Sequence, residues 1–312
     1  MNHAIVALAG GVGGAKLSEG LQQLLGEQLN VIGNVADDDT FWGLHVSPDL
    51  DTVTYWLAGV NDDERGWGLQ NETWHNYETL EQIGSNPWFR LGDRDLATHL
   101  TRNQLLLQGN TLTDVTAHLA KGWGVRARIL PITNDLLRTR LDTNIGTLAF
   151  QEYFVKHRHQ PTVHQIHFEG ATQARLTAEV ENALATATAI LLCPSNPFVS
   201  IEPLLAVQPL RTLLRESAVP IVAVSPIVAG EAIKGPAAAM FRAFGVTPSA
   251  TAVATRYADF LDGFILDVQD AHEQSAIESL GLQVAVTDTL MTDAAGRKRV
   301  AQVALTLCEE LG

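Results

Sequence analysis

Cysteines, cationic side chains and long apolar runs are all scarce in this 312-residue sequence. Its two cysteines, Cys193 and Cys308, lie far apart and form no Cys-x-x-Cys pair, which argues against a disulfide framework and a structural zinc site. The 21 Lys and Arg residues against 35 Asp and Glu residues give a net charge of −14, which is too acidic for a protein that follows a nucleic-acid backbone. No stretch approaches the ~18 apolar residues that would span a bilayer, and the first residues lack a cationic flank and a cleavage signal. We therefore expect a cytoplasmic protein that binds neither nucleic acid nor membranes.

Two common catalytic signatures are also missing. None of the ten histidines forms a His-x-x-x-His or His-Glu-x-x-His pair, so a zinc hydrolase is not indicated. The sequence has no Gly-x-Ser-x-Gly elbow, so a serine hydrolase is not indicated either. The composition, 46% apolar and 18% charged, is that of a globular chain near the upper size of a single core, and we expect one domain over residues 1–312.

Short apolar runs that alternate with helical periodicity predict an α/β fold. The runs cover residues 5–9, 30–36, 189–193, 220–224 and 264–266. Because they lack polar alternation, they suit strands that are covered on both faces, as in a parallel sheet. We predict a doubly wound, mostly parallel, Rossmann-like sheet.

The pattern changes between about residues 60 and 167, where Trp, Asn, Gln and charged residues are frequent. Amphipathic helical segments such as residues 95–107 outnumber strand signals there, and the polar stretch 156–161 marks a return to the sheet. We predict that this segment is a mainly helical cap inserted into the domain. In such folds the ligands bind beyond the carboxyl ends of the strands, so the loops after each run are the candidate sites.

The turn after the first run is rich in glycine and is followed by Lys16. Gly10, Gly11, Gly13 and Gly14 leave backbone N–H groups open to an anion at the start of a helix, and Lys16 adds a cation one turn later. The turn matches neither the Walker A loop nor the dinucleotide fingerprint, because Lys16 stands at a position where each requires another residue. We predict phosphate binding here; the alternative is a tight turn that only lets the helix and strand pack.

Five carboxylates follow the second run within fifteen residues. Asp37-Asp38-Asp39 stands where that strand should end, and Ser47 and Pro48 are typical of a helix start that places Asp49 and Asp51 in its first turn. Acidic residues in a first turn are common partners of the helix dipole, but clustered carboxylates at a strand end repel one another unless a cation is present. We predict Mg²⁺ binding, with substrate phosphates completing the site; the alternative is a set of solvated loop acids.

A third group of residues combines arginines with a predicted helix start. Asp95, His99 and Arg102 share one helical face at positions i, i+4 and i+7. Arg90 lies just before the turn Gly92-Asp93 and suits an anionic or planar aromatic ligand, since a guanidinium can both fork and stack. A surface ion-pair face would give the same pattern.

Short polar side chains also follow the later apolar runs. Ser195 and Asn196 follow one of them, and Ser225 follows another, with Lys234 further along. Such side chains can recognise a base or a ribose, or can simply form turns. We predict that they belong to a nucleotide-binding end of the site.

Taken in order, these motifs resemble the 2-phospho-L-lactate transferase family, the CofD-like enzymes of coenzyme F420 biosynthesis. The resemblance spans nearly the whole chain and includes the glycine turn, the stretches 47–52 and 91–95, and the motifs at residues 194–197 and 225–228. It implies a transferase that moves a phospho-carboxylate group (2-phospholactyl, phosphoenolpyruvyl or 3-phosphoglyceryl) from its guanosine diphosphate adduct. The acceptor is the terminal ribityl hydroxyl of the deazaflavin Fo, and the products are GMP and F420-0 or its dehydro form.

The resemblance also implies roles for individual residues. Asp51 is the expected catalytic residue, near the ribityl hydroxyl as an orienting group or base, and with Arg90 it contacts Fo. The other expected substrate contacts are Asn34, Gly92 and Asp93. The expected nucleotide and phosphate contacts are Gly10, Gly11, Gly13, Gly14, Lys16, Ser195, Asn196, Ser225 and Lys234. The expected Mg²⁺ ligands are Asp37, Asp38 and Asp49, although the division of these aspartates and Asn34 between metal and donor stays open.

Two alternative functions share some of these features. A related family of gluconeogenesis-type regulators shares the glycine turn and the sheet, which gives the alternative of a non-catalytic sensor of nucleotide sugars. The stretches 47–52 and 91–95 favour the transferase. An NAD-dependent dehydrogenase is disfavoured by Lys16 and by the lack of a lone ribose-binding acid after the second strand. The family and the Trp-rich segment suggest a homodimer.

Overall fold

A computed structural model of the chain describes residues 4–85 and 87–312, and its centre is a parallel sheet of seven strands. The strand order is β14-β13-β10-β9-β1-β2-β5, and every neighbouring pair is parallel. The strands are β1 (Ala4–Ala9), β2 (Leu29–Gly33), β5 (Arg128–Pro131), β9 (Ala187–Leu192), β10 (Ile221–Val224), β13 (Gly263–Asp267) and β14 (Gln283–Thr287). All five predicted runs fall on these strands, so the predicted Rossmann-like sheet is confirmed.

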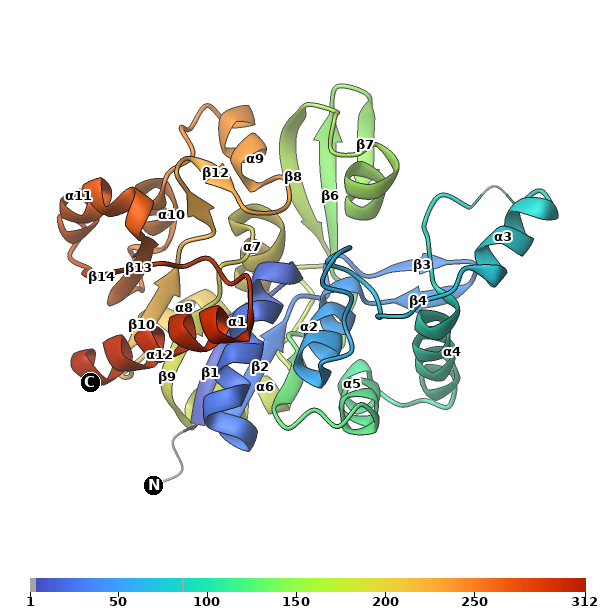
Figure 1. The fold of residues 1–312 in the computed structure, drawn as a ribbon, viewed down its shortest axis with the longest axis horizontal. Helices are drawn as coiled ribbons and strands as arrows, with labels where there is room; N and C mark the ends of the chain where they lie inside the picture. Colours follow the sequence, from blue (N-terminus) through green and yellow to red (C-terminus); the bar gives the residue numbers. More distant parts are fainter. Residues whose placement is uncertain (1–3, 86) are drawn as a thin grey trace.

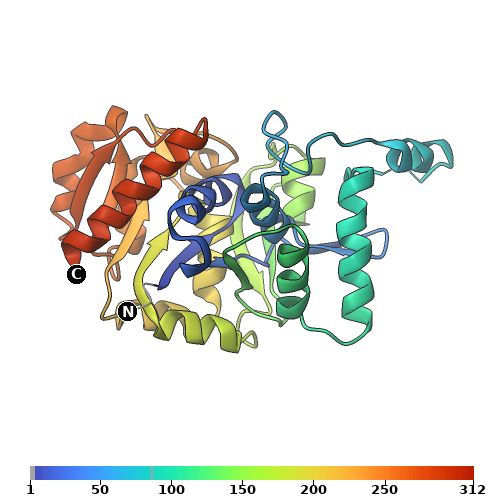
Figure 2. The same cartoon turned by 60° about the horizontal axis from the view of Figure 1, so that its bottom comes forward.

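Helices cover both faces of the sheet (Figures 1 and 2). One layer holds α1 (Gly11–Leu25), α2 (Pro48–Ala58), α5 (Leu112–Gly122) and α12 (Ala294–Leu311), with α1 packed between α2 and α12. The helix α6 (Ala178–Ala185) packs against β1, β5 and β9. The chain adds strands in one direction from β1 to β5 and in the other from β9 to β14, so right-handed connections place the two sets of helices on opposite faces.

The reversal of strand order lies between β1 and β9, and it positions the site. The loops that leave the carboxyl ends of these two adjacent parallel strands diverge to opposite faces of the sheet, which opens a crevice between them. The glycine turn follows β1, and the motif at residues 194–197 follows β9. Topology therefore brings these two motifs together although they are far apart in the sequence.

Two predicted element boundaries differ in the structure. The helix α1 begins at Gly11, so the glycines at positions 11, 13 and 14 form its first turn rather than a loop before it. The strand β2 ends at Gly33 instead of continuing to Ala36, because the side chain of Asn34 accepts a hydrogen bond from the backbone N–H of Ala36 at 2.9 Å and turns the chain.

The segment from residue 60 to residue 167 is more mixed than a mainly helical cap. It contains α3 (His75–Gln82), α4 (Asp93–Leu107) and α5, but its strand β5 belongs to the central sheet. A second, antiparallel sheet in the order β7-β6-β8 follows, made of β6 (Arg138–Thr143), β7 (Gly146–Ala149) and β8 (Val163–Glu169). Polar residues alternate with buried ones along β6, so an apolar-run criterion does not detect it.

Two parts of the chain project from the body of the molecule in Figure 1. The hairpin of β3 (Asp39–Phe41) and β4 (Leu44–Val46) extends beside α3 and α4, and the β7-β6-β8 sheet lies above the central sheet in that view. The remaining elements are η1 (Gly26–Gln28), η2 (Glu152–Lys156), η3 (Pro197–Ile201), α7 (Glu202–Ala206), α8 (Leu210–Arg215), β11 (Ile227–Val228), β12 (Glu231–Ala232), α9 (Ala237–Ala243), α10 (Ala250–Tyr257), η4 (Val268–Glu273) and α11 (Gln274–Glu278). Across residues 4–85 and 87–312, no helix combines the length and apolar character needed to cross a membrane.

Candidate active site

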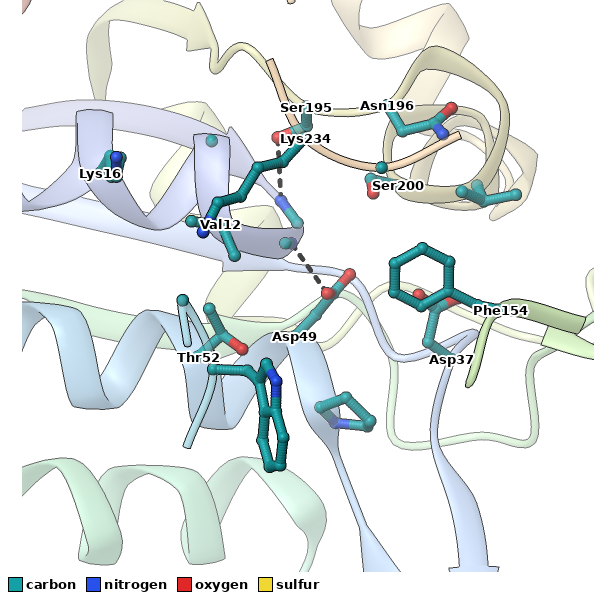
Figure 3. A pocket seen from close by; sticks show the side chains of 18 of the residues that line it. Val12, Lys16, Asp37, Asp49, Thr52, Phe154, Ser195, Asn196, Ser200 and Lys234 are labelled. Atoms are coloured by element: carbon teal, nitrogen blue, oxygen red, sulfur yellow. Dashed lines mark hydrogen bonds between the residues drawn. The ribbon is translucent and has the colours of Figure 1, made fainter. Parts of the chain in front are cut away.

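A cavity of about 600 Å³ lies at the carboxyl ends of the central strands. In Figure 3, Ser195, Asn196 and Ser200 lie on one side of the glycine turn and Asp49 and Thr52 on the other. Of the residues predicted for the site, those that line the cavity are Gly10, Gly11, Gly13, Lys16, Asp37, Asp49, Asp51, Arg90, Ser195, Asn196, Ser225 and Lys234. The sheet topology thus gathers most of the predicted site in one place.

The glycine turn is held by side chains from two other loops. The backbone N–H of Gly10 donates to Ser195 Oγ at 3.2 Å, and that of Gly11 donates to Asp49 Oδ1 at 2.8 Å. The next N–H groups of the first turn, those of Val12 and Gly13, have no carbonyl one helical turn before them within the helix. Those two amides and the positive end of the helix dipole suit an anion such as phosphate.

The absence of side chains in this turn also serves packing. A Cβ on Gly13 would lie 2.1 Å from the carbonyl oxygen of Pro194, so α1 approaches the loop after β9 more closely than any other residue would allow. Gly14 does not line the cavity, and a Cβ there would lie 2.7 Å from Ser195 Oγ. The packing explanation therefore accounts for Gly14, while Gly10 and Gly13 both pack tightly and face the cavity. Gly11 faces the cavity with more room, since a Cβ there would meet only Asp49 Oδ1, at 3.9 Å, but its positive φ of 62° favours glycine.

Asp49 is a buried carboxylate at the centre of the cavity wall. Its Oδ2 accepts a hydrogen bond from Asn34 Nδ2 at 2.9 Å, in addition to the bond from Gly11. Burial raises the pKa of Asp49 to about 6, although the hydrogen bonds from Asn34 and Gly11 act in the opposite direction. Asn34 is itself buried and does not line the cavity, so the structure makes it a residue that positions Asp49.

Asp37 is the second carboxylate that meets the cavity from this side. Burial and the neighbouring charge of Asp49 raise the pKa of Asp37 well above its ordinary value. Its Oδ1 is buried and has no hydrogen-bond partner in the described part of the chain. Two carboxylates that oppose each other's ionisation, one with an unpartnered oxygen, form an environment that a divalent cation would stabilise.

Asp38, the third predicted metal ligand, lies elsewhere. It does not line the cavity, and its Oδ2 accepts from Ser47 Oγ at 2.7 Å and pairs with His45 Nε2 at 2.8 Å. Ser47 stands at the N-cap position of α2 as predicted, but its hydroxyl is used by Asp38 and makes no capping bond. Within the residues that the structure describes, no three His, Cys, Asp or Glu side chains form a group able to hold a metal ion by themselves.

Asp51 meets the cavity next to a buried ion-pair network. One of its oxygens, Oδ1, pairs with Arg102, and its other oxygen, Oδ2, has no hydrogen-bond partner among the described residues. The predicted face of Asp95, His99 and Arg102 is buried, so the alternative of a surface ion-pair face is wrong. Helix α4 turns this face inward because it packs beside β4 and α5 at the edge of the cavity.

Two lysines give the cavity a cationic end. The Lys16 ammonium donates to the carbonyl oxygen of Met291 at 2.9 Å and lies 5.3 Å from the ring centre of Trp56. Burial and the charge of Lys234 lower the pKa of Lys16. The Lys234 ammonium lies against Gly66 from the opposite wall, where a Cβ on that glycine would be 2.0 Å from Nζ. Neither ammonium has a carboxylate salt-bridge partner in the described ranges, so this end of the cavity is suited to an anion.

The far end of the cavity is aromatic. It is lined by Trp88, Phe89, Phe150 and Phe154, and Phe89 is supported by Phe41, with the two rings stacked at 3.8 Å. Sequence reasoning did not identify these aromatics as a site because they come from two separate segments with no recognisable spacing. Such a wall suits a planar ring system.

Arg90 lines the aromatic end, but its guanidinium already has partners. It stacks on the rings of Trp74 and Tyr77, with centroid distances of 4.6 and 5.0 Å. The protein's own aromatics therefore occupy at least part of the guanidinium surface, and the contact of Arg90 with Fo stays a prediction.

Gly92 and Asp93 do not line the cavity, so their role as substrate contacts stays a prediction that this geometry does not support. The carboxylate of Asp93 accepts hydrogen bonds from Thr73 Oγ1 at 2.7 Å, from the His75 N–H at 3.0 Å and from the Asn76 N–H at 2.9 Å. These bonds tie the start of α4 to the start of α3. Gly92 packs so closely on Glu72 that a Cβ would lie 1.9 Å from its Cγ. The turn is therefore an anchor for the segment that carries Arg90.

The polar residues after β9 and β10 are cavity residues that also shape their own loops. Asn196 Oδ1 accepts from the Phe198 N–H at 2.9 Å, and Ser225 Oγ donates to the carbonyl oxygen of Ile227 at 2.8 Å. Both interpretations of these side chains, as turn formers and as site residues, are consistent with their positions.

Comparison with known proteins identifies relatives that match almost the full chain. A phosphoenolpyruvate transferase of Kitasatospora aureofaciens is 41% identical over 315 residues, which cover 98% of each chain. A phosphoenolpyruvate transferase of Mycobacterium tuberculosis is 41% identical over 310 residues, covering 93% of this chain and 94% of the relative. A 2-phospho-L-lactate transferase of Methanosarcina mazei is 37% identical over 300 residues, covering 96% and 98%.

Among solved structures, a UPF0052 family protein from Bacillus halodurans matches with a TM-score of 0.62 at 14% identity, and the match covers 97% of this chain and 98% of that one. This match concerns the fold alone. The sequence model described as "2-phospho-L-lactate transferase CofD" matches residues 5–304. The resemblance inferred from the motifs is confirmed: the chain belongs to the CofD family of 2-phospho-L-lactate transferases.

Proposed function

We propose that this chain is a Mg²⁺-dependent transferase that moves a phospho-carboxylate group from its guanosine diphosphate adduct to the ribityl hydroxyl of Fo and releases GMP. The observation that carries the proposal is one cavity with three chemically distinct parts: a cationic end at a helix N-terminus, a set of aspartates in the middle, and an aromatic end. A diphosphate donor and a planar acceptor fit the two ends and meet at the aspartates. Family membership supports the same reaction.

The donor's diphosphate would bind at the glycine turn. The amides of Val12 and Gly13 lie at the positive end of α1. The Lys16 and Lys234 ammonium groups supply charge that no salt bridge neutralises in the described part of the chain. Ser195, Asn196 and Ser225 line the same part of the cavity and would contact the nucleoside.

The deazaflavin ring would bind at the aromatic end, where Trp88, Phe89 and Phe154 offer apolar ring faces. Arg90 would hold this wall through its stacking on Trp74. This placement directs the ribityl chain of Fo toward Asp51, which lies between the two ends.

Asp37 and Asp49 fit a divalent cation on the basis of their burial, their mutually unfavourable charges and the unpartnered Oδ1 of Asp37. Mg²⁺ is usually bound by one or two carboxylates together with substrate phosphates and water, so two aspartates suffice. When bound, the ion would neutralise charge on the phosphate oxygens. Asp38 would support the site from behind through Ser47 and His45.

The chain's own residues account for the remaining steps. The ribityl oxygen attacks the phosphorus that carries the carboxylate moiety, the bond from this phosphorus to the GMP phosphate oxygen breaks, and the hydroxyl proton passes to Asp51. Asp51 is suited to this role because its Oδ2 has no hydrogen-bond partner within residues 4–85 and 87–312. Attack on phosphorus requires positioning and positive charge rather than a covalent enzyme intermediate, which agrees with a site that contains helix amides, lysines and carboxylates.

The proposal is tested by incubating the purified chain with Fo and each of the three donors, with Mg²⁺ or with EDTA. The relatives are named for two different donors, so each donor is offered separately. Mass spectrometry should detect one F420-0-type product, and chromatography should detect GMP in equal amount, with both lost in EDTA. Binding of the donor without product from any of the three would instead support the nucleotide-sensor alternative.

A further inference from the structure

We propose that Asp95 and His99 are positioning residues for the transfer: through Arg102 they fix the carboxylate of Asp51 in the orientation that leaves its Oδ2 free for the acceptor hydroxyl. This inference rests on the proposed function, because it assigns a purpose to the surroundings of Asp51. It concerns residues of α4, which lie more than forty positions from Asp51 in the sequence.

The contacts form a continuous chain from Tyr55 to Asp51. The Tyr55 hydroxyl donates to Asp95 Oδ1 at 2.6 Å, and His99 Nε2 lies 3.3 Å from Asp95 Oδ2. On its other side, His99 Nδ1 lies 3.0 Å from Arg102 Nη1, and Arg102 Nη2 pairs with Asp51 Oδ1. Arg102 therefore bridges the histidine and the aspartate.

These contacts determine which ring nitrogen of His99 carries the proton. A guanidinium can only donate, so His99 Nδ1 must accept from Arg102 and cannot carry a hydrogen. The ring proton then resides on Nε2, which lies 3.3 Å from Asp95 Oδ2 in an ion-pair contact that lacks hydrogen-bond geometry. The negative charge of Asp95 beside Nε2 favours the tautomer of His99 that can hold Arg102.

Burial makes this arrangement specific. His99 is 1% exposed and Arg102 is 2% exposed, so water cannot substitute for a lost partner. Burial opposes the ionisation of Asp95, yet the neighbouring His99 and the hydrogen bond from Tyr55 hold the pKa of Asp95 below its ordinary value. A charged Asp95 is therefore maintained beside Nε2 of His99.

The last residue of the network, Asp51, has one oxygen that takes part in none of these contacts. Asp51 Oδ1 is held by Arg102, whereas Oδ2 is buried at the cavity wall without a hydrogen-bond partner among the described residues, 3.8 Å from His99 Nδ1. Since His99 Nδ1 carries no hydrogen, it cannot donate to Oδ2. The tautomer favoured by Asp95 thereby leaves this oxygen without a donor from His99.

The sharpest perturbation is Asp95→Asn, which keeps the size of the side chain but removes an acceptor. With the amide –NH₂ facing Nε2, His99 would move its proton to Nδ1, which then repels Arg102. A wrong histidine tautomer can cause a severe loss of kcat in catalytic triads, and a misplaced catalytic group can lower turnover by about 10²-fold. We expect kcat to fall by about 10²-fold, with KM values for Fo and donor changed by less than about threefold.

The double variant Asp95→Asn/His99→Asn gives the discriminating result. The amide oxygen of an asparagine at position 99 can accept from Arg102 without help from position 95, so we expect the double variant to transfer faster than Asp95→Asn alone. A purely structural role predicts instead that a second truncation in the same network lowers activity further. His99→Leu offers Arg102 no acceptor and should lose about 10²-fold in kcat.

Melting temperatures of all variants, with Thr116→Val in α5 as a buried polar control away from the cavity, separate unfolding from mispositioning. Nitrogen-15 NMR of the histidine rings should show the Nε2–H form of His99 in the parent and the Nδ1–H form in Asp95→Asn. Parental kcat in Asp95→Asn or His99→Leu, or absence of rescue in the folded double variant, would overturn the inference. An inactive parent would refute the proposed function instead, and the ring tautomers would still decide whether the relay exists.

Discussion

Replacement of Asp49 by Asn tests the buried carboxylate pair most directly. The substitution keeps the shape of the side chain and the acceptor for the Gly11 N–H, but it removes an ionisable carboxyl group. Burial raises the pKa of that group from an ordinary value of 3.8 to about 6. The substitution also places an amide donor opposite the Asn34 Nδ2 donor, which costs about 1–3 kcal/mol at any pH. The two effects are separable because only the first depends on pH.

The sign and size of the pH-dependent effect follow from the raised pKa. A carboxyl group whose pKa is raised in the folded state does not change the free energy of unfolding below about pH 4, because it is protonated in both states. Between about pH 4 and pH 6 it destabilises the fold increasingly, because it ionises more easily in the unfolded chain. The full shift of about two pKa units corresponds to about 3 kcal/mol, of which about 2 kcal/mol develops between pH 4 and pH 7. Asp49→Asn lacks this penalty, so relative to the parent it should gain about 2 kcal/mol over that range. For 312 residues this is a relative rise of about 3–4 °C in melting temperature.

The assay is thermal unfolding of the parent and of Asp49→Asn in EDTA at several pH values between 4 and 8, repeated with Mg²⁺. In the parent, Mg²⁺ should raise the melting temperature above about pH 6, where the carboxylates are ionised, and much less at pH 5. In the variant the Mg²⁺ effect should be strongly reduced at every pH, because Asp37 alone remains of the two carboxylates proposed to hold the ion.

A different pattern would refute the reasoning. If the variant is destabilised by the same amount at pH 4 and pH 7, the carboxylate of Asp49 is a structural partner of the glycine turn with an ordinary pKa. If Mg²⁺ stabilises both proteins equally, the ion binds elsewhere.

Three further substitutions probe the rest of the cavity. Asp51→Asn should lower single-turnover transfer by about 10²–10⁴-fold while Fo still binds, and parental turnover would exclude it as the group that receives the hydroxyl proton. Arg90→Lys removes the planar surface that stacks on Trp74, so Fo binding measured by fluorescence should weaken while donor affinity stays at the parental level; unchanged Fo binding would separate Arg90 from the acceptor site. Gly13→Ala puts a methyl group 2.1 Å from the Pro194 carbonyl oxygen, so we expect a loss of about 1–3 kcal/mol in unfolding free energy and a higher KM for the donor. An unaltered melting temperature would show that the turn has room for a side chain.

The order of the central strands and their loops was largely predictable, because buried parallel strands leave uninterrupted apolar runs. The runs at residues 5–9 and 189–193 both proved central, and the polar residues that follow them lie at the cavity. The strands β6 and β8 were not predictable in the same way, because each has one exposed face and carries polar residues there.

The chemical composition of the site was also visible in the sequence, whereas the division of labour among its aspartates was not. Asp37 and Asp38 are adjacent in the chain and look equivalent, yet only Asp37 lines the cavity. The chain turns at this point, with the Asp38 N–H bonded to the Val35 carbonyl oxygen at 3.1 Å, so one side chain reaches the cavity and the other reaches Ser47 and His45. Asn34 was expected at the substrate and is instead the partner of Asp49.

By itself, the sequence determined the residue types, their order along the chain and the sheet they would build, because local periodicity and turn chemistry depend only on neighbouring residues. Tertiary structure alone decided which of them touch: that Gly13 must be glycine because Pro194 lies against it, and that Asp51 is held by Arg102 of a distant helix. These contacts arise from the reversal of strand order between β1 and β9 and from the orientation of α4, whose Arg102 face is buried. The strand order and the helix orientation are both set by the burial of apolar surface over the whole fold.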